Sequence, residues 1–244
     1  MLQVCLNGAR TRNECAALPG TPDELAAAAR EAVRAGAEDI HLHPKDATGQ
    51  DTLDPDRVAA AVAAVRAAVP GVPVGVTTGA WTATHPGERV ANVGAWTVLP
   101  DHASVNWHED GAAAVAEALL ARGIGVEAGI YSGTDAARRF LAWPHAHRAL
   151  RVLAEVTDTD PLTARETAAA LLDSLKAKID LPILLHGQDT AAWTILTMAA
   201  ARCLDTRIGL EDVLHLPDES PAESNDNLIL AARHIIDQTF GQSH

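Results

Sequence analysis

Short apolar runs rich in β-branched residues alternate along the chain with longer, alanine-rich stretches whose apolar positions recur at helical spacing. Such alternation is typical of repeated strand–helix units. It predicts eight strands, near residues 2–7, 38–43, 72–78, 103–107, 124–128, 150–156, 181–186 and 204–209. It also predicts eight helices, over residues 22–36, 55–69, 85–95, 110–122, 134–142, 161–177, 189–203 and 222–239.

Two of the predicted helices carry clear start signals. The segment Thr21-Pro22-Asp23-Glu24 offers a capping hydroxyl, a proline suited to the first turn and two acidic residues. Asp54-Pro55 repeats the pattern at the start of the next helix. Capping side chains and first-turn acids satisfy the free N–H groups and favour the positive end of the helix dipole.

Eight strand–helix units in 244 residues predict an α/β fold, a single (β/α)₈ TIM barrel over residues 1–244, which typically needs about 250 residues. The alternative is an open doubly wound sheet, whose first strand should run into a glycine-rich phosphate-binding turn. Here the first strand runs into the long irregular segment NGARTRNECAALPG. A barrel uses such a loop as one wall of a site at the carboxyl ends of its strands, so we favour the barrel.

Composition narrows the function classes. With 48% hydrophobic and 21% charged residues the chain is globular, and a net charge of −13 with scattered Lys and Arg argues against nucleic acid or an anionic membrane surface as partner. No apolar run approaches the roughly 18 residues of a membrane span, and the first residues lack a secretion signal. We therefore expect a cytoplasmic protein, with Cys5, Cys15 and Cys203 reduced.

The predicted second strand ends in His41-Leu42-His43. Because side chains alternate along a strand, both imidazoles should point into the barrel. The alternative is a pair of hydrogen-bonded core histidines. Glu211, after the eighth strand, should reach the same mouth, and two histidines with one carboxylate form a catalytic type of ligand set. We expect a divalent metal, with Zn²⁺ favoured over Fe²⁺, Mn²⁺ and Co²⁺.

Further polar residues end the other predicted strands. Arg207 lies four residues before Glu211, and Asp212 directly follows it, so an Arg–carboxylate pair beside the metal is expected. Glu127 is expected to end the fifth strand. The candidate substrate-binding residues are Thr77, Thr78, Gly79, Ser104, Asn106 and His186. For these candidates, the alternative to a functional role is a structural one: part of a turn, a structural ion pair or a solvated surface position.

The segments AGAEDIHLHPKD and RIGLED, together with the TTG turn and the SVNW strand, resemble the β-keto acid cleavage enzyme family, whose founding activity cleaves 3-keto-5-aminohexanoate. The resemblance spans nearly the whole chain. It implies a barrel with Zn²⁺ on His41, His43 and Glu211 and a homo-oligomer, a tetramer or dimer. It also implies a reaction of a β-keto acid with acetyl-CoA that gives acetoacetate and a new acyl-CoA.

The same resemblance implies residue roles. Arg207 and Asp212 match residues assigned to proton transfer, and a hydroxyl of the TTG segment matches a ligand of a substrate oxygen. Asp212 is our first choice for the catalytic carboxylate, and Glu127 is the alternative. Glu14 in the first loop matches a position that contacts the distal end of the substrate; a solvated loop charge is the plainer interpretation.

Several departures from the family limit the comparison. The chain is shorter than the usual member by a few tens of residues, Pro44-Lys45 stands where valine and arginine are common, and His186 and Gln188 replace less polar residues. These changes surround the substrate and thioester pockets, and the metal ligands match. The metal and the keto-group chemistry therefore carry over more directly than acetyl-CoA or the identity of the β-keto acid.

Two other classes of function fit parts of the sequence. A metal-dependent barrel hydrolase of an amide or lactone also uses a His-x-His pair, but usually on its first strand and with further His and Asp ligands. A non-catalytic barrel that binds a metabolite would retain the polar mouth without turnover. Hydrolysis without CoA would identify the first, and binding without product would identify the second.

Overall fold

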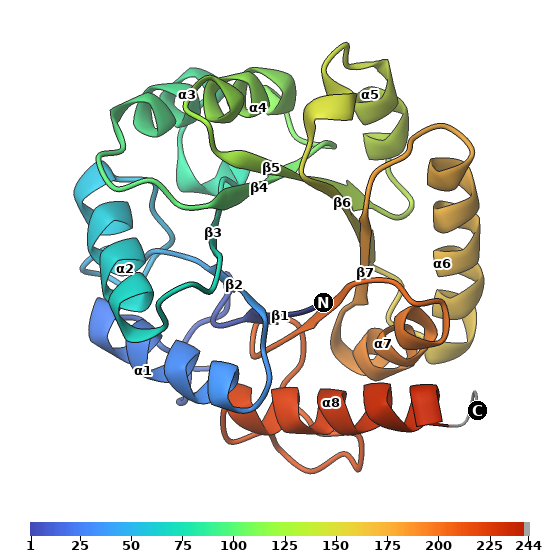
Figure 1. The fold of residues 1–244 in the computed structure, drawn as a ribbon. Helices are drawn as coiled ribbons and strands as arrows, with labels where there is room; N and C mark the ends of the chain where they lie inside the picture. Colours follow the sequence, from blue (N-terminus) through green and yellow to red (C-terminus); the bar gives the residue numbers. More distant parts are fainter. Residues whose placement is uncertain (242–244) are drawn as a thin grey trace.

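The computed structural model describes residues 1–241 and shows a central ring of strands surrounded by helices (Figure 1). The last three residues of the predicted domain, 242–244, lie outside the described part. The strands are β1 (Leu2–Cys5), β2 (Asp39–Leu42), β3 (Val74–Thr77), β4 (His102–Asn106), β5 (Gly125–Tyr131), β6 (Arg151–Val156), β7 (Ile183–Gly187) and β8 (Thr206–Ile208). The α-helices are α1 (Pro22–Arg34), α2 (Pro55–Ala68), α3 (Pro86–Ala95), α4 (Ala112–Ala121), α5 (Ala136–Ala142), α6 (Pro161–Lys176), α7 (Ala192–Ala201) and α8 (Asn225–Gly241).

The strands form one parallel sheet in the order β7-β6-β5-β4-β3-β2-β1-β8. The ring closes where β7 meets the start of β8: Leu185 N–H donates to the Asp205 carbonyl at 2.9 Å, and the Thr206 hydroxyl donates to the Leu185 carbonyl at 2.8 Å. The predicted (β/α)₈ barrel is confirmed. A parallel barrel brings the carboxyl ends of all strands to one mouth, which places residues distant in sequence within one site.

The predicted helix starts are also confirmed. The Thr21 side chain accepts from Glu24 N–H while Glu24 accepts from Thr21 N–H, which is a complete capping box. The Asp54 carboxylate accepts from the first-turn N–H groups of Asp56 and Arg57. Such caps each stabilise a helix by about 1 kcal/mol.

Most element boundaries differ from the predictions by one or two residues, and two of the larger differences concern the fifth strand and the last helix. The fifth strand continues to Tyr131, beyond the predicted end at residue 128. Gly129 permits this, because a Cβ at that position would lie 2.8 Å from the Asn106 Oδ1 atom of the neighbouring strand. The last helix begins at Asn225 instead of residue 222, because Ala222 N–H pairs with the Leu214 carbonyl in the preceding loop.

Apolar side chains fill the space between the barrel and its helices, and every residue of β1, β2, β3 and β4 is buried. Helix α8 lies across the outside of the barrel between α1 and α7 (Figure 1). Asn225, at its start, bonds to Leu210 N–H and to the Leu6 carbonyl, which fixes the loop after β8 against β1. Within residues 1–241, no helix is long and apolar enough to cross a membrane.

Candidate metal centre

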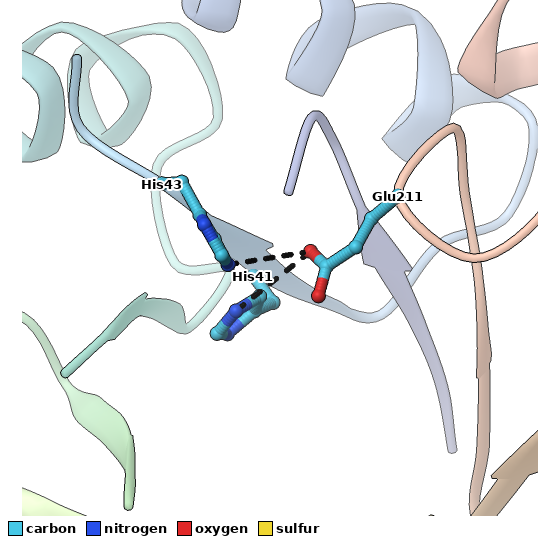
Figure 2. A group of neighbouring side chains, drawn as sticks. All are labelled: His41, His43 and Glu211. Carbon is cyan, nitrogen blue, oxygen red and sulfur yellow. Dashed lines mark ion pairs between the residues drawn. The ribbon is translucent and has the colours of Figure 1, made fainter. Parts of the chain in front are cut away.

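His41, on β2, and His43, just after it, lie beside Glu211 from the loop after β8 (Figure 2). Both histidine side chains are buried, and one ligand atom from each of the three residues lies within 4.8 Å of the others. The Oε2 atom of Glu211 is 3.8 Å from His41 Nε2 and 3.6 Å from His43 Nε2. The predicted pairing of the two histidines with Glu211 is therefore present, and we call these residues the His–His–Glu trio.

The trio fits a metal ion better than it fits a hydrogen-bonded cluster. Donor atoms about 2.0–2.2 Å from a tetrahedral Zn²⁺ lie roughly 3.4 Å from one another, close to the two spacings at Glu211. Glu211 Oε2 is buried and has no hydrogen-bond partner among the described residues. A buried carboxylate oxygen without a donor is costly unless a cation completes its coordination. The three residues can therefore hold a metal.

Gly8, in the first loop, makes room for Glu211. Its φ is +61°, which favours glycine, and a Cβ there would lie 2.4 Å from Glu211 Cγ. The Arg10 guanidinium, two residues later, donates to the Glu211 carbonyl at 3.0 Å. The start of the first loop thus positions the carboxylate ligand from both sides.

The ring of His43 is oriented by Asp51, which follows β2 in the chain. Asp51 Oδ2 lies 2.8 Å from His43 Nδ1 and also accepts from Trp81 Nε1 at 2.7 Å, while Lys45 Nζ contacts its other oxygen. A carboxylate on Nδ1 places the proton there and leaves Nε2 with a free lone pair. His43 is therefore held in the tautomer that binds a metal through Nε2.

We expect Asp51→Asn to weaken metal binding by about 10- to 100-fold, the usual effect of losing a carboxylate behind a histidine ligand. Competition with a chromophoric chelator measures the affinity. Asp56→Asn is the matched control, because Asp56 is exposed at the start of α2. Equal affinity in both variants would mean that Asp51 does not orient the ligand.

Burial lowers the pKa of His41 to about 4, so its imidazole is neutral near pH 7, which is the form that binds metals. Its Nδ1 atom lies 4.0 Å from Glu127 Oε2. Glu127 was expected at the end of the fifth strand, and that position is wrong. It is the third residue of β5 and lies inside the barrel, because the strand continues to Tyr131.

Glu127 belongs to a buried ionic layer with Asp39, His102 and Arg151. Arg151 donates to Glu127 at 2.7 Å and to Asp39 at 2.8 Å. His102 lies 2.9 Å from Asp39 Oδ1 and 3.0 Å from Glu127 Oε2. Burial opposes a charge on His102, but Glu127 and Asp39 raise its pKa to about 10. Each charge of the layer has a partner of opposite sign, as a buried ionic cluster requires.

The raised pKa of His102 predicts a pH-dependent stability. The protonated ring contributes stability that is fully present below the ordinary pKa of about 6.5 and is lost as the pH rises through about 10. We expect the melting temperature to fall between pH 7 and pH 10 by at least about 3 °C more in the wild type than in His102→Gln, the effect of roughly 1 kcal/mol in a chain of this size. Calorimetry across this range measures it, and equal slopes would contradict the assignment.

Arg207, on β8, links the trio to the predicted catalytic carboxylate. One guanidinium nitrogen donates to Glu211 at 2.9 Å and to Asp212 at 2.7 Å, and Nε donates to His186 Nδ1 at 3.2 Å. Burial raises the pKa of Asp212 above its ordinary value, although Arg207 opposes the change. Its Oδ2 atom is buried without a hydrogen-bond partner among the described residues. Asp212 therefore keeps one oxygen free beside the trio.

A small hollow of about 30 Å³ opens between the trio and the ends of the central strands. Among the predicted substrate-binding residues, Thr77, Ser104 and Asn106 line it. The remaining lining residues are Trp81, Tyr131, Leu153, Glu155, Arg207 and the trio itself. The hollow is small, and its lining is mostly polar.

The other predicted substrate-binding residues do not line this hollow. The Thr78 hydroxyl donates to the Ser104 carbonyl at 2.6 Å, and Gly79 N–H donates to Thr77 Oγ1 at 3.2 Å, so both stabilise the turn after β3. His186 is fully buried behind Arg207. The Glu14 side chain is 47% exposed and pairs with Arg10 and Thr11 within the first loop. The roles predicted for these residues stay predictions.

Several residues of the site were missed from sequence, among them Asp51, Tyr131 and Glu155. Asp51 lies in the loop after β2 and lacks a motif, although its spacing of eight residues from His43 and the intervening glycine indicate a returning turn. Tyr131 was placed in a loop because the fifth strand was predicted too short. Glu155 lies one residue before the end of β6, on the side of the strand that faces the inside of the barrel. The alternation of side chains along the strand could have identified it.

The fold and site define a (β/α)₈ barrel with a His–His–Glu trio able to hold a metal at the carboxyl ends of its strands. A family model described as beta-keto acid cleavage enzyme matches residues 1–242. The chain therefore belongs to the beta-keto acid cleavage enzyme family, and the resemblance noted in the sequence is confirmed.

Solved structures with the same fold include ObcA and a dehydratase. The apo structure of ObcA has a TM-score of 0.71 at 17% identity and covers 93% of this chain and 62% of its own. A ternary complex of ObcA with a C4-CoA adduct and oxalate has a TM-score of 0.71 at 16% identity, over 93% of this chain and 64% of its own. Type I 3-dehydroquinate dehydratase from Clostridium difficile has a TM-score of 0.64 at 11% identity, over 97% of this chain and 92% of its own. This chain thus spans less than two thirds of ObcA, and at these identities the likeness shows the fold alone.

Proposed function

We propose that this protein is a Zn²⁺-dependent β-keto acid cleavage enzyme that transfers an acyl group between a β-keto acid and acetyl-CoA. The observation that carries the proposal is the His–His–Glu trio facing a small polar hollow that Arg207 also lines, with Asp212 buried behind the hollow and bonded to Arg207. Membership of the family supports the reaction class. The ObcA complexes with oxaloacetate and with a C4-CoA adduct support a short keto acid and a CoA thioester as ligands.

The proposed reaction exchanges two bonds for two others. The bond between C2 and C3 of the β-keto acid and the C–S bond of acetyl-CoA break. The C2 fragment joins the acetyl carbonyl to give acetoacetate, and the acyl group that contained C3 joins the CoA sulfur. The proton removed from C2 returns to the same carbon in the product, so no oxidant, reductant or water is consumed.

The trio would hold the metal that stabilises the negative charge formed during cleavage. A divalent metal bound there would polarise the keto group of the substrate and stabilise negative charge on its oxygen. Two neutral imidazoles and one carboxylate leave coordination positions open, which is typical of a catalytic zinc site. Fe²⁺, Mn²⁺ and Co²⁺ accept the same donors, so metal analysis of purified protein decides among them.

Asp212 is the proposed acceptor of the C2 proton. Its Oδ1 atom accepts from Arg207, which also bonds to Glu211, and its Oδ2 atom has no hydrogen-bond partner among the described residues. Arg207 fixes the carboxylate and supplies positive charge that favours the enolate form of the substrate. Glu127, the other predicted catalytic carboxylate, is paired with Arg151 and His102. It also lies near His41, so its contacts support a role in positioning that metal ligand.

The hydroxyl and amide groups on the other side of the hollow are the proposed ligands of substrate oxygens. Thr77 ends β3 and is paired in register with Ser104, in the middle of β4. Asn106 is fixed by a hydrogen bond from its amide to Glu109, which Arg89 holds in turn at 2.6 Å. Side chains fixed in this way orient a ligand with little further loss of freedom.

The proposed path for acetyl-CoA is a groove of about 320 Å³, lined in part by Arg10, Arg12 and Lys45. Arg10 and Lys45 connect it to the metal centre, since they bond to the carbonyls of Glu211 and Gly8. Three cationic side chains along one groove are notable in a chain with net charge −13. They suit the phosphates of CoA.

We expect Arg12→Ala to raise the KM for acetyl-CoA by about two- to fivefold with kcat retained, because an exposed charge contributes only a modest part of anion binding. The effect should shrink at high ionic strength, where exposed charges are screened. Arg30→Ala is the matched control, because Arg30 is exposed on α1 away from the groove. An unchanged KM in Arg12→Ala would place the CoA path elsewhere.

We also propose an oligomeric state and a cellular location for the enzyme. Family membership supports the expected homo-oligomer, either a tetramer or a dimer, and a cytoplasmic enzyme. Light scattering coupled to size-exclusion chromatography measures the mass in solution. A monomer would contradict the first of these expectations.

The test of the proposed function is an assay of metal-loaded protein with a panel of β-keto acids, with and without acetyl-CoA. Mass spectrometry follows acyl-CoA and acetoacetate, and His41→Ala serves as the inactive control. We expect both products only when acetyl-CoA and His41 are present. Product formation without CoA would favour the hydrolase, and binding without product would favour the non-catalytic barrel.

A further inference from the structure

His186, on β7, is a fully buried histidine that does not line the hollow. The proposed reaction therefore gives it no contact with substrate. A buried polar side chain destabilises a fold unless its polar atoms have partners, so a histidine at this depth needs a use for both ring nitrogens. The partners of the two nitrogens indicate that use.

The Nδ1 atom of His186 accepts a hydrogen bond from Arg207. Arg207 Nε lies 3.2 Å from this nitrogen, whereas Asp212 Oδ1 lies 3.7 Å from it, so the arginine is the closer partner. An arginine Nε–H can only donate, and the nitrogen that accepts from it must carry a lone pair. The proton of a neutral His186 ring therefore lies on Nε2.

The Nε2 atom of His186 faces Glu155, the residue paired with it in register on β6. It lies 3.5 Å from Glu155 Oε2 and makes no shorter hydrogen bond among the described residues. The other oxygen of Glu155 accepts from the Gln188 side-chain amide, which keeps the carboxylate in place. Burial raises the pKa of Glu155, but the attraction of His186 and Arg207 outweighs burial and keeps the pKa below its ordinary value. Glu155 is therefore ionised near pH 7 and attracts the Nε2 proton of His186.

Arg207 is held at two points, and His186 is one of them. Its NH2 atom donates to Glu211 at 2.9 Å and to Asp212 at 2.7 Å. Because a guanidinium group is planar and rigid, a hydrogen bond that fixes Nε also fixes the direction of NH2. The imidazole of His186 therefore bears on the contacts that Arg207 makes with a metal ligand and with the proposed proton acceptor.

We propose that His186 is a positioning residue, which fixes the guanidinium of Arg207 against Asp212 and Glu211 without touching the substrate. The proposal rests on the proposed function for the role of Arg207 in the reaction. It has two alternatives. His186 could bind substrate itself, as the sequence predicted, or it could be a core histidine whose loss lowers stability alone.

The tautomer of His186 tests the contact with Arg207 without substrate or metal. Long-range ¹H–¹⁵N correlation spectra of the full chain with ¹⁵N-labelled histidine distinguish the two neutral tautomers and the imidazolium form. The signals of His186 are identified by their loss in His186→Gln. We expect a proton on Nε2 and a lone pair on Nδ1 at pH 7. A proton on Nδ1, in either of the other two forms, would overturn the proposal, because Nδ1 could then not accept from Arg207.

Two variants of His186 separate positioning from the alternatives. His186→Leu removes both hydrogen-bonding atoms and should lower kcat by about 10- to 100-fold, the usual effect of losing a residue that orients a site residue. The KM for the β-keto acid should stay within about threefold of the wild-type value. His186→Gln keeps one acceptor and one donor and should retain kcat within about threefold. His147→Leu, in the exposed turn before β6, is the matched control.

A raised KM with full kcat in His186→Leu would identify a substrate ligand and overturn the proposal. Full kcat in a variant with a lower melting temperature would identify a core histidine and overturn it as well. Should His186→Leu not fold, His186→Met takes its place, because methionine adapts to irregular space in a core.

A double-mutant cycle with Arg207→Lys tests whether His186 acts through the arginine. Lysine keeps the positive charge and lacks the Nε–H group that His186 fixes. In the Arg207→Lys background, His186→Leu should therefore lower kcat by less than about threefold further, which is strong non-additivity. Losses that multiply in full would overturn the proposal. If the wild type turned over no β-keto acid, the proposed function would be contradicted, and the tautomer would decide the contact between His186 and Arg207 alone.

Discussion

Replacing His43 with alanine should remove most of the bound metal and lower kcat/KM by about a thousandfold or more. The expected loss corresponds to about 4 kcal/mol of transition-state stabilisation, which is within the range of metal polarisation of a carbonyl. Asn7 bonds to the backbone N–H and carbonyl of residue 43, so the chain path should survive the substitution. Metal content after dialysis and steady-state kinetics measure the two effects.

His147→Ala is the matched control for this result. His147 is exposed in the short turn before β6 and belongs to no metal cluster among the described residues. It should keep wild-type metal content and activity. Retention of stoichiometric metal in His43→Ala would show that the ion binds elsewhere, and wild-type turnover without metal would contradict the role of the trio.

Asp212→Asn should lower kcat by about 10²- to 10⁴-fold while the protein keeps its metal. This is the usual contribution of a positioned acid–base group. Asparagine keeps the size of the side chain, and its amide oxygen accepts the hydrogen bond from Arg207, but it cannot take a proton from the substrate. Kinetics and metal analysis on the same preparation separate proton transfer from metal binding.

Asp173→Asn, on the exposed face of α6, controls for the loss of one negative charge. It should behave as the wild type. If Asp212→Asn retained full kcat, another group would have to accept the C2 proton, and Glu127→Gln would be the next variant to measure.

The fold was predictable because its signal is repeated along the chain. Each strand is short, apolar and followed by an amphipathic helix, so small errors at the boundaries do not change the architecture. The metal trio was predictable because alternation places His41 and His43 on one side of β2, and strand closure brings the loop after β8 to the same mouth.

The rest of the site depended on details that alternation alone does not determine. Glu127 was expected at the mouth because the fifth strand was predicted to end at residue 128, whereas it continues through Gly129, which the close approach of Asn106 requires, to Tyr131. That error also removed Tyr131 from the predicted site. Asp51 reaches His43 through the returning loop after β2; the sequence indicates a turn there, but no motif marks Asp51 as the residue that meets His43.

The most direct test of the central claim follows a β-keto acid labelled with ¹³C at C1 and C2 through a single incubation with unlabelled acetyl-CoA. The account predicts that both labelled carbons appear in acetoacetate, that the acyl-CoA product is unlabelled, and that both products vanish when the metal is removed. Label recovered in acetate instead, or formation of an acid without CoA, would show hydrolysis and contradict the proposed acyl transfer.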